Sequence, residues 1–163
     1  MKNVPLEDDA RSVRESLQGH RLEALATLAL LTGMRRDELL HLTWAEVDLE
    51  QGELHVLNAK TKRNARVITL SQEVTQMLRD HQLRQMEQGR EAEGADPRSH
   101  LVFPDDTGGV FSPQRFGEVW HTLLEHAGFP SRRFHELRML AWRRLLEQAR
   151  KRRESKPNTN IDE

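Results

Sequence analysis

The stretch Thr32-Gly33-Met34-Arg35-Arg36-Asp37-Glu38-Leu39-Leu40 joins an apolar segment to a short charged one. Apolar residues upstream recur with the spacing of a buried helical face, at Leu22, Leu25, Leu28, Ala29 and Leu31. Gly33 suits a helix end that requires a positive φ, and helical spacing resumes at Leu39. Such a turn can hold an arginine rigidly with its guanidinium free, as bidentate phosphate binding requires. Taken alone, the stretch favours an ordinary connection between two helices with surface arginines.

The composition describes one very polar domain. The 163 residues are 36% hydrophobic and 31% charged, which is the size and character of a single domain. No apolar run is long enough to span a membrane and no signal peptide opens the sequence, so we expect a cytoplasmic protein without a membrane partner. Cysteine is absent, which excludes disulfides and thiolate metal sites. Tyrosine is absent too, and the net charge of -1 does not indicate nucleic-acid binding by itself.

The hydrophobic pattern predicts a mostly helical domain with a few short strands. Helices are expected at about 7–17, up to about 31, at 37–42 and 72–88, from Ser112-Pro113 to Gly128, and from Phe134 through Leu146. Residues 53–57 and 65–70 alternate as strands do, and residues 101–103 form a short buried strand or extended piece. The basic loop between the first two strands is expected at a hairpin tip, where its lysines are either solvated or able to reach a neighbouring groove.

Two of these helices have clear apolar faces. The face of the 72–88 helix comprises Val74, Met77, Leu78 and Leu83. The face of the helix after Ser112 comprises Phe116, Val119, Trp120, Leu123, Leu124 and Ala127. Core packing explains the aromatic residues of the second face better than a protein-interaction surface does, although that role stays open.

Single polar residues have ordinary explanations. His135 and Arg138 lie one turn apart and share a helix face, as surface residues often do. His121 and Glu125 are four residues apart, but no further ligand supports a metal site, and a solvated face explains them better. We therefore expect no metal.

The order of the pieces is more specific than any one of them. An arginine follows an apolar helix, a lysine lies between two strands, and a histidine and an arginine open a late helix. These blocks resemble the catalytic domain of tyrosine recombinases, the phage integrase family. The resembling segments are residues 32–44, Val47-Asp48-Leu49, Ala59-Lys60-Thr61-Lys62, 66–70, Leu101-Val102-Phe103 and Phe134-His135-Glu136-Leu137-Arg138. The resemblance implies an α+β fold, mostly helical with a small antiparallel β-sheet.

The resemblance also implies a role for each matching residue. Arg35 and Arg138 would bind the scissile phosphate of double-stranded DNA, Lys60 would protonate the leaving 5′ oxygen, and His135 would transfer protons. Glu38 would support the first arginine. Two arginines can stabilise the charge that develops on the nonbridging oxygens without a metal. A positioned acid contributes about 10²–10⁴-fold. The family reaction therefore implies no cofactor.

The match ends after Arg138. The family requires a tyrosine nucleophile, and this chain has none; Met139-Leu140 stands where a histidine-threonine or similar pair is expected. We expect an incomplete catalytic domain over residues 1–142, followed at 143–163 by a basic helix extension and a frayed tail. The abrupt departure suggests a truncated or frame-shifted gene end, and the separate helical DNA-clamping domain of the family is not represented.

Three functional hypotheses remain. The first is a recombinase fragment that binds a phosphodiester but cannot form a phosphotyrosyl bond alone. The second is a non-catalytic DNA-binding or regulatory module, whose basic end would contact the DNA backbone or be merely solvated. The cations assigned to it are Arg143, Arg144, Arg150, Arg152 and Arg153. The third is a composite site, in which a homo-oligomer or a full-length recombinase protomer supplies the tyrosine. An apolar face of the last helix is expected to be left exposed and to promote self-association.

Overall fold

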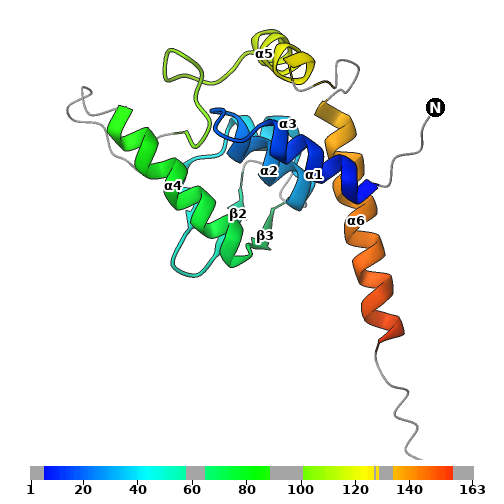
Figure 1. The fold of residues 1–163 in the computed structure, drawn as a ribbon. Coiled ribbons are helices and arrows are strands. Elements are labelled where there is room, and N and C mark those ends of the chain that lie inside the picture. The colour runs from blue at the N-terminus through cyan, green and yellow to red at the C-terminus, as the bar shows by residue number, and fades with distance from the viewer. Residues whose placement is uncertain (1–5, 58–64, 89–100, 127, 129–133, 156–163) are drawn as a thin grey trace, which may run out of the picture.

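The computed structural model describes residues 6–57, 65–88, 101–126, 128 and 134–155. Its elements follow the predicted order, with one short 3₁₀ turn and one additional strand (Figure 1). The helices are α1 (Leu6–Ser16), α2 (Glu23–Thr32), α3 (Arg36–Leu40), α4 (Gln72–Gln88), α5 (Pro113–His126) and α6 (Phe134–Glu154), and the 3₁₀ turn spans Trp44–Glu46. The strands are β1 (Val47–Asp48), β2 (Glu53–Val56) and β3 (Arg66–Thr69). The predicted α+β fold is confirmed.

Helix α2 forms the centre of the domain. Every residue from Ala24 to Leu30 is buried, as expected of a helix that is apolar on all sides. It contacts α1, α3, α4 and α6, which surround it in Figure 1 with α4 and α6 on opposite flanks. Helix α2, which ends before Gly33, therefore forms the core against which both α3 and α6 pack.

The small sheet lies below α2 in Figure 1 and has the order β1-β2-β3, with both pairs antiparallel. Leu54 of β2 pairs with Ile68 of β3, and Leu54 is fully buried. The two strands predicted from alternation are confirmed. Strand β1 was not foreseen, because two residues are too few to show a period. The connecting residues 58–64, which include Lys60, lie outside the described residues.

Helix α4 begins at the predicted cap, where the Oγ of Ser71 accepts a hydrogen bond from the backbone N–H of Val74 at 3.3 Å. Val74 and Leu78 face the core, but the prediction that Leu83 is buried is wrong, since 59% of it is exposed. The inward position is occupied instead by His81, whose Nε2 lies 2.6 Å from the carbonyl oxygen of Val102. The second half of α4 packs on a segment with carbonyl groups that need donors, so a polar side chain faces inward there.

Helix α5 packs against the beginning of α6 and fixes its position. Its predicted cap is confirmed by the hydrogen bond from the N–H of Arg115 to the Oγ of Ser112, at 3.1 Å. Phe116 and Trp120 are buried and stack on each other. The ring of Phe134, the first residue of α6, meets both edge-to-face at centroid distances of 5.4 and 5.2 Å. This aromatic cluster sets the position of the turn that carries Arg138.

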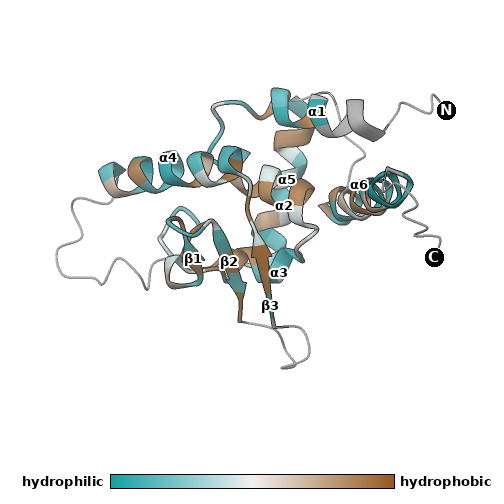
Figure 2. Cartoon of the chain, turned by 90° about the horizontal axis from the view of Figure 1, so that it is seen from below, coloured by the Kyte–Doolittle hydropathy of each residue, from teal (hydrophilic) through white to brown (hydrophobic). Residues whose placement is uncertain are grey.

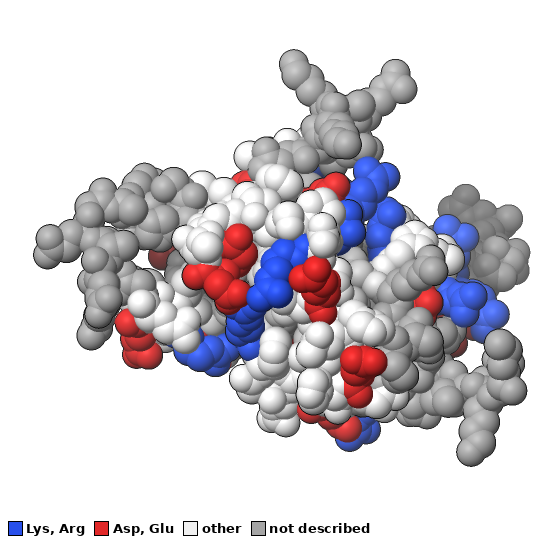
Figure 3. Space-filling model, turned by 90° about the horizontal axis from the view of Figure 1, so that it is seen from above, with Lys and Arg blue, Asp and Glu red and all other residues white. Residues whose placement is uncertain are grey.

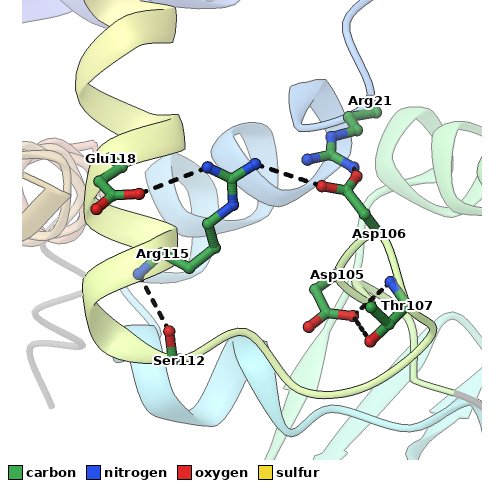
Figure 4. Close-up of polar contacts among 7 residues, drawn as sticks. All are labelled: Arg21, Asp105, Asp106, Thr107, Ser112, Arg115 and Glu118. Carbon is green, nitrogen blue, oxygen red and sulfur yellow. Dashed lines mark hydrogen bonds and ion pairs between the residues drawn. The ribbon is translucent and has the colours of Figure 1, made fainter.

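Ion pairs connect α5 to the rest of the domain (Figure 4). Asp106 pairs with Arg21, in the segment before α2, and with Arg115 of α5, which also lies 3.5 Å from Glu118. Asp105 accepts hydrogen bonds from the backbone N–H and the hydroxyl group of Thr107, and these bonds shape the turn that contains Asp106. Figure 3 shows that basic and acidic side chains are mixed on the upper face of the molecule. This face therefore does not present the single-sign surface that binds a DNA backbone strongly.

Helix α6 runs without a break from Phe134 to Glu154, so residues 143–154, which were expected to form a basic helix extension, continue the helix that begins at Phe134. One face buries Leu137, Leu140 and Ala141. Another face exposes large apolar residues, as the sequence led us to expect (Figure 2 shows the helix nearly end-on). These residues are Met139, Trp142, Leu145 and Leu146. None of the described helices is long and apolar enough to cross a membrane.

Candidate functional site

The glycine turn between α2 and α3 sets the position of Arg35. Gly33 has a φ of +67° and its N–H hydrogen-bonds the carbonyl oxygen of Ala29 at 3.0 Å, which ends α2. A Cβ at this position would meet Trp142 Nε1 at 3.5 Å, an ordinary contact. The backbone conformation, rather than lack of space, is therefore what requires glycine here. Two residues later Arg35 is exposed at the start of α3.

The second predicted arginine reaches the same turn from α6. The Nε of Arg138 donates a hydrogen bond to the carbonyl oxygen of Gly33 at 2.9 Å. Burial lowers the pKa of the Arg138 guanidinium, and the positive charge of Arg35 lowers it further, while Glu38 opposes the shift. Arg35 and Arg138, 103 positions apart in the sequence, thus lie within electrostatic reach of each other.

Glu38 stabilises the turn that carries Arg35. Its side chain is buried, and its Oε2 accepts a hydrogen bond from the backbone N–H of Arg35 at 2.8 Å. The guanidinium of Arg66, the first residue of β3, binds both carboxylate oxygens at 3.0 Å. Burial alone would raise the pKa of Glu38, but the hydrogen bonds from Arg66 and Arg35 outweigh it, so the pKa lies below its ordinary value. Glu38 therefore remains ionised and joins α3 to the sheet.

The other predicted site residues are placed as follows. His135 is exposed in the first turn of α6, three residues before Arg138. Lys60 cannot be placed, because it is outside the described residues. The strand that leads to its segment is held by Glu46, a buried residue that accepts a hydrogen bond from the N–H of Leu57 at 3.3 Å. The strand that follows the segment of Lys60 is β3. Its first residue, Arg66, hydrogen-bonds Glu38 and so attaches the strand to α3.

The basic residues assigned to the end of α6 are not gathered at the Arg35–Arg138 turn. At 1.5 Å per residue, Arg150 to Arg153 lie about 18–22 Å along the helix from Arg138. Arg150 lies 3.6 Å from Glu154 on its own helix. Arg143 is exposed, whereas Arg144 is half-buried and close enough to Glu73 of α4 to lower the pKa of that carboxyl. The direct ion pair between Arg14 and Glu73 is the larger cause of this shift.

Sequence analysis did not identify Arg66 as part of the site. A buried acid next to two arginines signals that a cationic partner exists, because a buried charge needs one. The pattern of residues 65–70 gives no hint that the partner is the first residue of that strand. His121 and Glu125 lie 3.6 Å apart on the exposed face of α5. In the part of the chain that the structure describes, no group of three His, Cys, Asp or Glu side chains could hold a metal ion.

The sequence and the fold both match known proteins. Residues 7–153 match the profile of the Phage integrase family. A curated relative, a tyrosine recombinase XerC-like protein of Caldanaerobacter subterraneus subsp. tengcongensis, is 29% identical over 166 residues, which cover 86% of this chain and 42% of the relative.

Solved structures of recombinases share the fold. The XerA recombinase matches with a TM-score of 0.71 at 20% identity, over 87% of this chain and 50% of its own. The Tn1549 transposon integrase in complex with transposon right end DNA matches with a TM-score of 0.69 at 19% identity, over 91% of this chain and 54% of its own. This chain thus spans about half the length of these relatives. The chain belongs to the phage integrase family and has the fold of a tyrosine recombinase catalytic domain.

Proposed function

We propose that this chain is the phosphodiester-binding part of a site-specific DNA recombinase. Arg35 and Arg138 bind nonbridging oxygens of one DNA phosphate, Lys60 is the general acid for the leaving 5′ oxygen, and His135 transfers protons. The observation that carries the proposal is the hydrogen bond from Arg138 Nε to the carbonyl oxygen of Gly33, because it brings the second arginine beside the turn that holds the first. Such a protein works on DNA at the nucleoid, in the cytoplasm.

The charges around this turn favour a bound anion. The carboxylate of Glu38 is engaged by Arg66, so the positive charges of Arg35 and Arg138 are not cancelled by it. Burial, and after it the positive charge of Arg35, lowers the pKa of the Arg138 guanidinium, so the two like charges are close enough to repel each other. A phosphate between them relieves this repulsion, and it gains charge in the transition state that fixed cations stabilise.

Binding to double-stranded DNA tests the proposal. Arg35→Gln and Arg138→Gln should each weaken binding about tenfold or more, since a hydrogen bond to a charged group is worth about 1.5–3 kcal/mol. Arg36→Gln is the matched control, because Arg36 is adjacent, carries the same charge and lies 3.4 Å from Asp37. Fluorescence anisotropy at one fixed salt concentration measures all three. Equal effects at positions 35, 36 and 138 would contradict the proposal.

The chemical step requires a nucleophile from elsewhere, since this chain contains no tyrosine. Incubated alone with a nicked suicide substrate, the chain should bind DNA and form no covalent protein–DNA adduct. A covalent adduct of the chain alone would show that another residue attacks the phosphate. If the site is composite, a partner protomer supplies the tyrosine. Adding a full-length recombinase whose arginine equivalent to Arg35 has been replaced should then restore cleavage in the mixed oligomer.

A second function, non-catalytic DNA binding, is favoured by one feature of α6. Its basic end projects beyond the helices of the core (Figure 1), where Arg152 and Arg153 are exposed to solvent. The triple variant Arg150→Gln/Arg152→Gln/Arg153→Gln should reduce the magnitude of the negative slope of log K against log salt by about 2.7 if all three bind phosphates, at about 0.9 per contact. An unchanged slope would mean that this end is merely solvated.

A further inference from the structure

Three arginines surround one buried carboxylate at the candidate site. Glu38 is 7% exposed and interacts electrostatically with Arg35, Arg66 and Arg138. Arg138 also senses the charges of Arg35 and Arg66. Among the described residues, the guanidinium of Arg66 is the one that hydrogen-bonds this carboxylate, with Nη1 on Oε1 and Nη2 on Oε2. The remaining bond to Oε2 comes from a backbone N–H, that of Arg35.

This division of partners has a chemical consequence. A bidentate guanidinium–carboxylate pair satisfies both oxygens and both charges. The Arg66 side chain is 39% exposed, whereas the carboxylate that it binds is buried. The Arg138 guanidinium uses its Nε to bind Gly33, and its two terminal nitrogens form no hydrogen bond with the described residues, so they can bind a ligand. The Arg35 guanidinium is likewise not drawn into a hydrogen bond with Glu38.

Without Arg66, the Glu38 carboxylate would compete with the DNA phosphate for the remaining arginines. A buried carboxylate that loses its partner takes the nearest available cation, because an unpaired buried charge is strongly unfavourable. Among the described residues, two other cations already interact electrostatically with Glu38, namely Arg35 and Arg138. Glu38 would then occupy a guanidinium that the proposed function assigns to DNA.

We propose that Arg66 is a positioning residue, which occupies the Glu38 carboxylate and so keeps the guanidinium groups of Arg35 and Arg138 available for a phosphodiester. The proposal deepens the proposed function and rests on it. It differs from direct DNA contact by Arg66, in which the charge of Arg66 itself binds phosphate. It also differs from a purely structural link between β3 and α3, which would affect stability alone.

A suppressor experiment separates these three roles. The salt slope for binding a double-stranded oligonucleotide is measured for wild type, Arg66→Gln, Glu38→Gln and the double variant. In Arg66→Gln the released carboxylate neutralises one arginine, so the magnitude of the slope should fall by about 0.9, one phosphate contact. In the double variant no carboxylate remains, and the wild-type slope should return even though Arg66 is absent.

Other outcomes overturn the inference. If Arg66 contacts DNA directly, the double variant keeps the reduced slope of Arg66→Gln. If the link is only structural, Arg66→Gln lowers the melting temperature and leaves the slope unchanged. Should this double variant not fold, Arg66→Met/Glu38→Leu replaces it, because apolar residues of similar volume can substitute for a buried ion pair. A wild-type slope supports the proposal, and a slope reduced as in Arg66→Gln contradicts it. Failure of the proposed function is recognised separately, because Arg35→Gln and Arg138→Gln would then have no more effect than Arg36→Gln.

Discussion

The Nε of Arg138 donates a hydrogen bond to the carbonyl oxygen of Gly33 across 105 positions of sequence, at 2.9 Å. This bond restricts the orientation of the guanidinium as well as its position, because Nε is fixed on the turn and the group is rigid and planar. Arginine is therefore needed here for its shape and not only for its charge.

Arg138→Lys tests this use of shape. A lysine keeps the charge but cannot bind the Gly33 carbonyl and present a planar pair of donors at the same time, so DNA affinity should fall about tenfold. Arg143→Lys, at an exposed position five residues further along α6, is the control and should change affinity less than about twofold, since a backbone phosphate accepts either cation. Anisotropy titrations measure both, and equal affinities of the two variants would argue against a shaped site.

Gly33→Ala should destabilise the domain. The left-handed backbone at Gly33 costs an L-residue about 1–2 kcal/mol, although the space for a methyl group is adequate. Gly117→Ala is the matched control, because Gly117 lies within α5 and an added Cβ would meet nothing within 4 Å. The control should stabilise the protein by about 0.5–1 kcal/mol. Urea denaturation measures the difference, and a neutral Gly33→Ala would show that the turn adopts another conformation.

Acidification should weaken folding through His81. Burial lowers the pKa of His81 below its ordinary 6.5, the hydrogen bond to the Val102 carbonyl opposes this, and the charge of Arg84 adds to the lowering. Because the unfolded chain binds the proton more tightly, the stability contributed by neutral His81 is complete above pH 6.5 and is lost as the pH falls through the lowered value.

His81→Gln should flatten this dependence while retaining a donor for Val102. The measurement is the unfolding free energy at a series of pH values from neutral to mildly acidic. His121→Gln, which removes an exposed histidine of α5, is measured alongside as the control for loss of a histidine. His20 contributes in the same direction, since burial and then the charge of Arg21 lower its pKa, so part of the slope should remain in His81→Gln. An unaltered profile in His81→Gln would exclude it as a source of the effect.

The exposed apolar face of α6 should cause self-association. Trp142 and Leu146 are 50% and 66% exposed and lie one turn apart, so they form a continuous surface rather than scattered residues. Sedimentation velocity should show a concentration-dependent dimer or larger species, and Trp142→Gln/Leu146→Gln should shift it toward monomer. Leu83→Gln removes a 59% exposed leucine from α4 and should have no such effect. A wild-type protein that stays monomeric at all concentrations would contradict the prediction.

Sequence patterns predicted the elements because helices, strands and caps depend on residues a few positions apart. Apolar spacing before Gly33 gave α2, and the side chains of Ser71 and Ser112 cap the helices that they were expected to begin. The resemblance of the ordered blocks gave the family, which the comparisons confirm. The same rules placed Leu83 inward, and this was wrong because a polar partner, the carbonyl of Val102, lies where α4 meets the 101–103 segment.

By itself, the sequence determined the helices, two of the three strands in the described part of the chain, the glycine at the turn and the order of blocks that identifies the family. Only the tertiary structure decided that Arg138 binds Gly33 and that Arg66, 28 positions from Glu38, takes its carboxylate. The physical reason is range. Periodicity and capping act within a turn or two of backbone, whereas the partner of a buried charge is chosen by whichever cation the packed helices and strands bring within hydrogen-bonding distance.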